Sequence, residues 1–340
     1  MASPDAYDVA ALLPGVGVFG GVRRFIEVGN EMVRRGHRYT IYHPEGTPPD
    51  WIGFEGEVRP LDVLAGAHHQ VVLCNDPPLY RKFHDISADV RLFYFVLEGI
   101  EDERSIVGGG WTPLANSESM HQYLKRRYRV DAHQVVGGIN LDVFRPVKVD
   151  RDPATFRVLT FGRVSRRKKG VDIVRRAAES LAGRSARRGG RRVKLVLFDH
   201  VGFGNEQDPR EVFKSSVECE WHINRSQSDL ASVYSSCDVF VNAEKKAGWT
   251  NTVAEAMACG VPVVCTKSGT LDMARHRETA WIARFRHPWF FRTGMEALRD
   301  DDFLSNHLRD TALAQMEHFS WPRVTDRLLG VIASELAGQR

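Results

Sequence analysis

The stretch that decides the fold is EKKAGWTNTVAEAMACGVPVVCT, from Glu244 to Thr266. It is predicted to form a loop, a helix and a strand. Thr250 or Asn251 offers a side-chain oxygen that can cap the helix, and Gly260 suits its C-terminal end. The apolar run from Val261 to Cys265 is typical of a strand buried on both faces. A helix that begins at such a loop presents free amides and a positive dipole end, which favours an anion site.

One acidic side chain, Glu255, lies just inside the start of this helix. A carboxylate beside phosphate-binding amides is unfavourable for the phosphate itself. It becomes useful when it reaches past the phosphate to accept hydrogen bonds from sugar hydroxyls.

This stretch resembles the nucleotide-binding segment of the retaining glycosyltransferases of family 4, which have the GT-B fold. That family shows a Glu, seven residues, and a second Glu followed by Ala-Met-Ala, a small residue, Gly and Pro-Val. The segment from Glu255 to Val263 fits the second half of this pattern. The first half departs from it, because Ala247 stands where the family has the Glu that is implied to touch the donor sugar. Glu244 lies three residues further upstream.

The resemblance implies that a nucleotide-sugar donor binds at the start of this helix, with Glu255 accepting hydroxyls of the nucleotide ribose. The donor-binding residues implied there are Gly248, Trp249, Thr250, Asn251, Thr252 and Glu255.

Length and composition favour a soluble chain of two domains, since 340 residues exceed one ordinary domain. The longest apolar runs are strand-sized, and the N-terminus lacks the features of a secretory signal. Five cysteines without metal-ligand spacing suit a reducing cytoplasm. We therefore expect a cytoplasmic protein.

The formal net charge of +4 is modest, but the basic residues cluster at 125–129, 163–169 and 184–194. A solvated face is one interpretation of such clusters. Anionic lipid, a polyanionic substrate and nucleotide phosphates are the others. Nucleic acid is not expected, because no recognition module is present.

The first half opens with a βαβ pattern: a strand over 7–13, a glycine loop, a helix from about Val22 and a second strand over 39–42. Gly15, Gly17 and Gly20 match a dinucleotide-binding pattern literally. The same opening also resembles the glycosyltransferase family, in which Gly20 and Gly21 would lie against the donor diphosphate. A purely structural turn is the third interpretation.

Glu98 follows the predicted strand over 91–97, at a sheet edge where ligands of parallel sheets collect. Family members commonly have a His near this point. Glu98 is predicted either to bind a sugar hydroxyl or orient the acceptor, or to be an ordinary loop acid. Glu101, Asp102 and Glu103 crowd the same loop.

The second half restarts the pattern with a strand over 156–161 and a helix from Val171. Arg163 and Lys169 match the family's Gly-Arg, short loop, Lys-Gly pattern, with one extra residue in the loop. A fork-shaped Arg and a point-charge Lys beside helix amides suit a diphosphate. Arg163 and Lys169 are therefore predicted to bind the donor and, with Glu98, to be catalytic.

The predicted architecture is α/β, with two Rossmann-like doubly wound domains facing across a cleft. Residues 1–147 would form the acceptor-side domain, 148–320 the nucleotide-sugar domain, and 321–340 a helix that packs back on the first. The resemblance implies transfer of a hexosyl group from a nucleotide diphosphate donor, with retention at the anomeric carbon and without a metal or cofactor.

The expected partners are the nucleotide sugar and a saccharide, glycolipid or small-molecule acceptor. Peripheral contact with an anionic membrane at the inner face is also expected, through the basic run at 125–129. Two alternatives stay open. One is a catalytically degenerate GT-B nucleotide-binding or scaffold protein, which Ala247 and the crowded acids from Glu98 to Glu103 favour. The other is an NAD-dependent oxidoreductase, which rests on the loop from Gly15 to Gly20.

Overall fold

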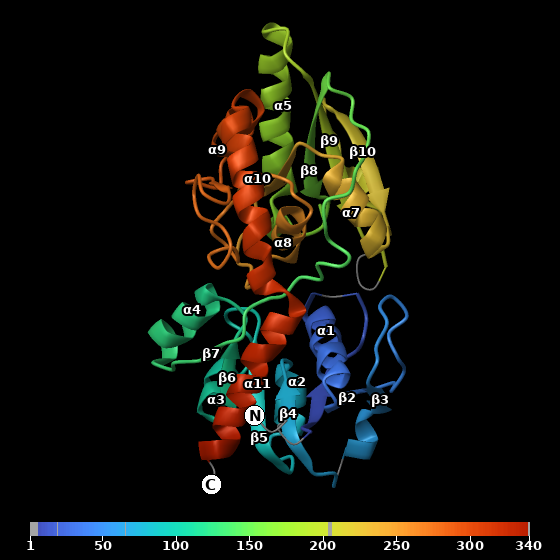
Figure 1. Cartoon of the computed structure of the whole chain (residues 1–340), viewed down its shortest axis with the longest axis vertical. Coiled ribbons are helices and arrows are strands. Elements are labelled where there is room, and N and C mark those ends of the chain that lie inside the picture. Colours follow the sequence, from blue (N-terminus) through green and yellow to red (C-terminus); the bar gives the residue numbers. More distant parts are fainter. Residues whose placement is uncertain (1–5, 19, 65, 203–205, 339–340) are drawn as a thin grey trace. The chain divides into compact units, whose positions relative to one another are not determined.

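The computed structural model describes residues 6–18, 20–64, 66–202 and 206–338. The chain divides into two compact units: Met1–Gly138 with Trp321–Arg340 is unit 1, and Ile139–Ser320 is unit 2. Each unit holds one parallel sheet covered by helices (Figure 1), so the predicted α/β class is confirmed.

The division falls at Gly138 rather than near Val147, where the sequence placed it. The intervening segment packs within unit 2. The Phe144 ring lies 6.2 Å from the Tyr234 ring, and the amide of Val147 donates to Ser235 Oγ at 3.0 Å.

Unit 1 has seven strands in the order β3-β2-β1-β4-β5-β6-β7. They are β1 Asp8–Leu12, β2 Arg38–His43, β3 Glu57–Pro60, β4 His69–Cys74, β5 Ala88–Phe95, β6 Thr112–Ala115 and β7 His133–Gln134. Its helices are α1 Gly20–Arg34, the 3-10 turn η1 Leu61–Leu64, α2 Pro77–Lys82, α3 Glu103–Gly108, α4 Glu118–Tyr128 and α11 Trp321–Gly338.

Successive side chains of the central strand β1 serve two separate cores, because a strand alternates its faces. Val9 and Ala11 pack in the core that includes α1 and α11. Ala10 and Leu12 pack in the core beneath α2, α3 and α4. Helix α11 belongs to the first core because Val324, Leu328 and Ile332 recur at helical spacing and are buried there.

Unit 2 has six strands in the order β10-β9-β8-β11-β12-β13. They are β8 Thr155–Phe161, β9 Arg192–Asp199, β10 Glu218–Ile223, β11 Val239–Asn242, β12 Val263–Cys265 and β13 Trp281–Ile282. Its helices are η2 Arg167–Lys169, α5 Val171–Arg187, α6 Pro209–Val212, α7 Gln227–Ser235, α8 Asn251–Ala258, α9 Pro288–Asp300, α10 Asp302–Met316 and η3 Glu317–Phe319.

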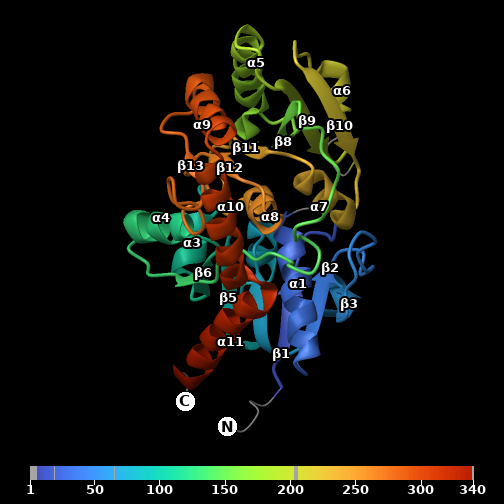
Figure 2. The same ribbon diagram turned by 45° about the horizontal axis from the view of Figure 1, so that its top comes forward.

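Helices α5 and α9 lie together over one face of this sheet, whereas α7 and α8 lie together and α8 covers β11 and β12 (Figure 2). In both units the first strand along the chain lies inside the sheet. The strand order reverses beside it, between β1 and β4 in unit 1 and between β8 and β11 in unit 2. Ligands of open parallel sheets bind outside the carboxyl ends of the strands at such a reversal. The topology thus indicates that ligands bind at the loops after β1, β4, β8 and β11.

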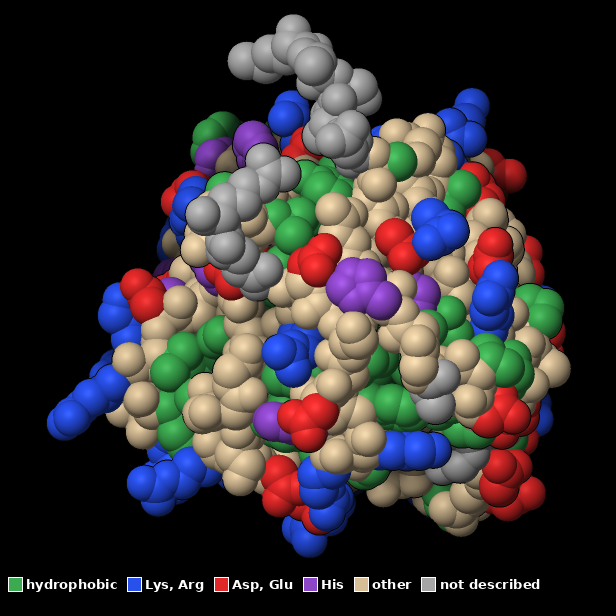
Figure 3. Space-filling model, turned by 90° about the horizontal axis from the view of Figure 1, so that it is seen from below, with side chains coloured by type: hydrophobic (Ala, Val, Ile, Leu, Met, Phe, Trp, Pro, Cys, Tyr) green, Lys and Arg blue, Asp and Glu red, His purple; other side chains and the backbone are tan. Residues whose placement is uncertain are grey.

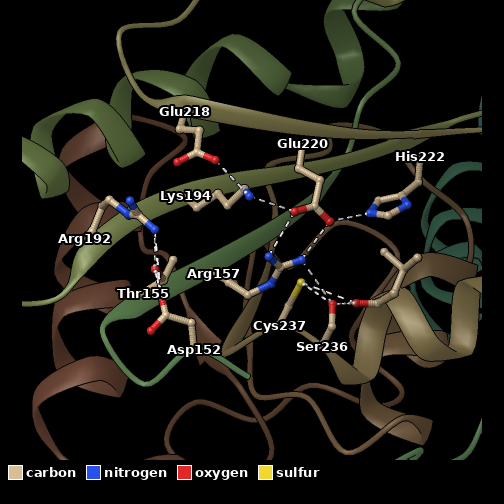
Figure 4. A network of polar contacts seen from close by, with 11 residues as sticks. Asp152, Thr155, Arg157, Arg192, Lys194, Glu218, Glu220, His222, Ser236 and Cys237 are labelled. Atoms are coloured by element: carbon tan, nitrogen blue, oxygen red, sulfur yellow. Dashed lines mark hydrogen bonds and ion pairs between the residues drawn. The ribbon is translucent and has the colours of Figure 1, made fainter. Parts of the chain in front are cut away.

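A charged network replaces apolar packing on part of the unit 2 sheet, at the edge strand β10 (Figure 4). Glu220 accepts two hydrogen bonds from Arg157, at 2.9 and 3.0 Å, and forms an ion pair with Lys194 at 3.0 Å. His222 lies 2.8 Å from the same carboxylate, and Glu218 pairs with Lys194 at 2.9 Å. Charged side chains on an edge strand discourage pairing with another chain.

Candidate active site

At the reversal point of unit 2, the loops after β8 and β11 meet through one ion pair. Lys169, in the loop after β8, places its Nζ 2.6 Å from Oε1 of Glu244, which follows β11. Glu244 is 4% exposed, and its backbone is fixed as well, since its amide donates to Asn242 Oδ1 and its carbonyl accepts from Thr266 Oγ1. The predicted donor residue Lys169 therefore lies at the reversal point, with a carboxylate partner.

Arg163 is held by a second buried carboxylate. Its Nε donates to Oδ1 of Asp199 at 3.0 Å, and its Nη2 donates to the carbonyl of His200 at 3.0 Å. The guanidinium carbon lies 5.3 Å from the Phe161 ring centre, and Lys169 Nζ lies 5.4 Å from the same centre. Both cations therefore share one aromatic neighbour, which brings the two predicted phosphate ligands close together.

Helix α8 begins beside these groups with its first amides uncapped. Thr250, one of the two predicted capping residues, is the N-cap residue, but the predicted hydrogen bond from a helix amide to its side chain is absent. Its Oγ1 donates instead to the carbonyl of Ser268 at 3.2 Å. Among the described residues, the amides of Asn251 and Thr252 have no backbone acceptor, so they remain available to an anion.

A tight turn after β12 supports the loop that carries Gly248 and Trp249. Gly269 has φ +68°, and a Cβ there would lie 2.7 Å from both Ala247 Cβ and Thr250 Oγ1. Its carbonyl accepts from the Thr250 amide at 3.0 Å. A glycine is required here, because any side chain would push the start of α8 away.

Glu255 lies one turn into α8 and is 4% exposed. Its Oε2 accepts from the hydroxyl of the buried Tyr234 at 2.8 Å. No local pattern indicates this partner. Trp249 packs its ring 5.2 Å from Phe319, and its buried Nε1 has no hydrogen-bond partner among the described residues.

Two cysteine thiols near α8 are buried. Burial raises the pKa of the Cys265 thiol to about 12, and burial likewise raises the pKa of Cys259, which follows α8. Both therefore stay protonated at neutral pH.

Unit 1 has its own reversal point, where Gly20 and Gly21 begin α1. The helix starts two residues before the predicted Val22. A Cβ on Gly21 would lie 3.3 Å from Nδ2 of Asn75, which follows β4. The glycine pair thus packs between the loops after β1 and β4. One turn further into α1, the buried Arg24 donates to the carbonyls of Val135 and Val136 at 3.0 and 3.2 Å and contacts the Tyr94 hydroxyl.

Glu98 is exposed in the turn after β5. Its acidic neighbours have structural partners. Arg81 pairs with Glu101 at 3.1 Å and with Asp102 at 2.9 Å. The buried Glu103 accepts from the hydroxyls of two tyrosines at 2.6 and 2.7 Å and from the amide of Gly99 at 3.0 Å. The crowding of acids that favoured a degenerate protein therefore has a structural cause.

Sequence reasoning missed Asp199 and Tyr234 and left Glu244 open. Asp199 and Glu244 share one signal, since each stands at the carboxyl end of an apolar strand. Within the described ranges, no group of three or more His, Cys, Asp or Glu side chains could hold a metal ion. Over the same ranges, no helix is long and apolar enough to cross a bilayer.

Comparison with known proteins gives related sequences. Residues 155–301 match the family model described as Glycosyl transferases group 1. D-inositol 3-phosphate glycosyltransferase of Saccharomonospora viridis is 29% identical over 258 residues, which are 70% of this chain and 59% of that protein. The protein named D-inositol 3-phosphate glycosyltransferase 1 of Catenulispora acidiphila is 30% identical over 224 residues, or 61% and 53% of the two chains. The chain thus spans little more than half the length of these curated relatives.

Solved structures share the fold at low identity. A glycosyltransferase from Rickettsia africae superposes with a TM-score of 0.76 at 16% identity, covering 98% of this chain and 99% of that one. HepE from Anabaena, solved in complex with UDP and glucose, gives 0.76 at 14% identity, covering 96% and 100%. The chain has the GT-B fold of these solved structures, and its residues 155–301 resemble the Glycosyl transferases group 1 family.

Proposed function

We propose that this protein is a glycosyltransferase that moves a hexosyl group from a nucleoside diphosphate to an acceptor hydroxyl, with retention at the anomeric carbon. The observation that carries the proposal is the convergence at the unit 2 reversal point. Arg163 and Lys169 belong to the loop after β8, and the open amides of Asn251 and Thr252 belong to the start of α8, which follows β11. A diphosphate is the ligand that such a set of donors suits.

The chemistry follows from where charge develops. As the glycosidic bond breaks, negative charge grows on the leaving diphosphate, so donors fixed beside it stabilise the transition state more than the ground state. Positive charge on the sugar is balanced by the departing diphosphate on the same face, which favours retention. This route needs neither a protein nucleophile nor a metal.

Glu244 supplies the carboxylate that Ala247 lacks. Its Oε1 accepts a hydrogen bond from Lys169 Nζ at 2.6 Å, which orients the lysine. In this proposal its Oε2 accepts a hydrogen bond from a hydroxyl of the donor sugar. Glu255 accepts hydroxyls of the nucleotide ribose, with Tyr234 holding the carboxylate in place. In unit 1, Gly20 and Gly21 are the further donor ligands of this proposal, and Glu98 is its acceptor ligand.

The relatives suggest which substrates to test first. HepE was solved with UDP and with UDP-glucose, so UDP sugars are the first donors. D-inositol 3-phosphate is the first acceptor, because the curated relatives carry it in their names. Saccharide and glycolipid acceptors are tested next. The proposal also places the protein in the cytoplasm, in peripheral contact with anionic membranes.

A thermal-shift and calorimetric screen of UDP, GDP, dTDP, ADP and NAD tests the site without the acceptor. A nucleotide present at about 100 times its Kd adds about 2.7 kcal/mol to the free energy of unfolding. We expect one nucleoside diphosphate to stabilise the protein, and Arg163→Ala and Glu255→Ala each to abolish this gain. Arg176→Ala is the matched control, since Arg176 is 63% exposed on α5 and its ion pair is with Asp172.

Sugar transfer is then measured as release of the nucleotide from the selected donor, and the anomeric configuration of the product is read by NMR. Binding of a nucleoside diphosphate without turnover on any acceptor would support the degenerate protein. Stabilisation by NAD alone would support the oxidoreductase and refute the proposal.

A further inference from the structure

The connection from β13 to α9 exposes two large aromatic side chains. Phe285 is 56% exposed and Trp289 is 51% exposed. Both rings pack against Phe290, at centre distances of 5.1 and 4.7 Å, and Arg284 lies over Phe285 at 5.3 Å. These contacts hold the rings in place while leaving about half of each in water.

Arg286 fixes this connection against two other loops of unit 2. Its Nε donates to the carbonyl of Ala243 at 2.7 Å, and its Nη2 donates to the carbonyl of Arg167 at 2.9 Å. The amide of Lys245 donates to the carbonyl of Lys168 at 2.8 Å, which joins the same two loops. The aromatic pair therefore belongs to one surface with the loops after β8 and β11.

That surface is strongly basic. Its exposed cations are Arg166, Arg167, Lys245, Lys246 and Arg284. We call these five residues with Phe285 and Trp289 the basic-aromatic surface.

A hollow of about 620 Å³ adjoins the basic-aromatic surface. Its lining includes Arg166, Arg167 and Lys214 with the apolar Val212, which is 48% exposed. Asp172 is the one acid in the lining, and neither Arg163 nor Lys169 contributes to it. The cations of the hollow are thus separate from the two proposed donor ligands.

We propose that the basic-aromatic surface of unit 2 docks the protein on a membrane that contains anionic lipid. Aromatic rings enter the interface between headgroups and acyl chains, while Arg and Lys remain with the headgroups. Each cation at the surface of an anionic membrane strengthens binding about fivefold. Lys169 and Glu244 lie in the same loops, so docking brings the proposed donor site to the interface. Only this last point rests on the proposed function.

Charge and exposure favour lipid over other occupants. A soluble polyanion would use the cations but would leave the two aromatic rings in water. A second copy in a two-fold contact would place like charges opposite each other. In contrast, the face drawn in Figure 3 carries acidic and basic side chains interspersed, which weakens attraction to an anionic bilayer.

Co-sedimentation of the full chain with lipid vesicles tests the proposal. We compare phosphatidylcholine alone with phosphatidylcholine plus phosphatidylglycerol, at low and high salt. We expect binding to the anionic vesicles only, and weakening by salt. Arg166→Ser with Arg167→Ser lowers the affinity about 25-fold, as two charges at about fivefold each. Phe285→Ser with Trp289→Ser lowers it at least about tenfold.

Two matched controls separate this surface from general stickiness. Phe303→Ser removes an aromatic ring that is 84% exposed elsewhere on unit 2, and it leaves vesicle binding unchanged. Lys125→Ser with Arg126→Ser removes two charges from α4 of unit 1. It lowers the affinity for anionic vesicles less than Arg166→Ser with Arg167→Ser does. Unfolding temperatures confirm that every variant is folded.

Three results would overturn the proposal. They are no binding to anionic vesicles at low salt, a greater loss in the α4 variant, and a concentration-dependent dimer that the Phe285 and Trp289 changes dissociate. Each is independent of nucleotide binding. A protein that binds UDP but no vesicles thus refutes the docking proposal and the proposed membrane contact, and leaves the proposed sugar transfer standing. A protein that binds anionic vesicles but no nucleotide refutes the proposed sugar transfer alone.

Discussion

Replacing Glu220 by Gln tests the charged network of Figure 4 quantitatively. Hydrogen bonds from Arg157 are the main cause that lowers the pKa of Glu220 from its ordinary 4.5 to about 2. A shift of this size corresponds to about 3 kcal/mol of favourable contacts to the ionised form. Because the side chain is 28% exposed, solvent screening reduces the effect on folding to roughly 1–2 kcal/mol.

The sign of the pH dependence follows from the direction of this shift. A carboxyl group with a depressed pKa contributes its full stability above the unfolded value near 4.5 and loses it as the pH falls toward 2. The difference between wild type and Glu220→Gln should therefore be constant from pH 5 to 7 and should vanish near pH 2.

Urea unfolding followed by circular dichroism measures this difference. With a slope of about 2 kcal/mol/M, the midpoint at pH 7 should fall by roughly 0.5–1 M. Glu218→Gln is the control, because Glu218 is 51% exposed and, among the described residues, forms one ion pair, with Lys194. Glu220 does not have the proposed role if Glu218→Gln lowers the free energy of unfolding as much as Glu220→Gln, or if the loss from Glu220→Gln persists at pH 2.

Further predictions concern the site and the C-terminal helix. Glu244→Gln leaves Lys169 without its counter-charge, so calorimetry should show UDP binding about fivefold tighter while turnover falls about tenfold. Gly269→Ala should weaken UDP binding about tenfold in the same titration, whereas Gly330→Ala, which has open space around it, should not. Ile332→Ala should destabilise unit 1 by about 2–4 kcal/mol in thermal unfolding, because Ile332 is fully buried in its core. Activity should survive EDTA, measured as nucleotide release.

The strand and the helix that carry the site could be predicted, because each has a characteristic residue pattern within its own segment. The run from Val263 to Cys265 is apolar and β-branched, and α8 has good helix formers between a cap and a glycine. Strand β10 escaped prediction, since its sequence ECEWHI alternates charges with other residues rather than forming an apolar run. Its charges find partners on β8 and β9, and no local pattern reveals those neighbours.

The start of α1 shows the opposite failure. Gly20 and Gly21 have poor helix propensity, so the sequence placed the start at Val22. The structure begins the helix at Gly20, because the chain must pass closely beside Asn75 there. Tertiary approach, rather than propensity, sets this boundary.

The ion pairs at the reversal point of unit 2 could not be derived from spacing, because each joins segments far apart in the sequence. Arg163 and Lys169 carry two positive charges, and Asp199 and Glu244 carry two negative charges, so the four side chains are neutral together. A diphosphate that brings about two further negative charges must therefore draw its stabilisation from elsewhere. The open amides at the start of α8 supply it. The two carboxylates then fix the orientation of the cations before the donor arrives, which lowers the entropy lost on binding.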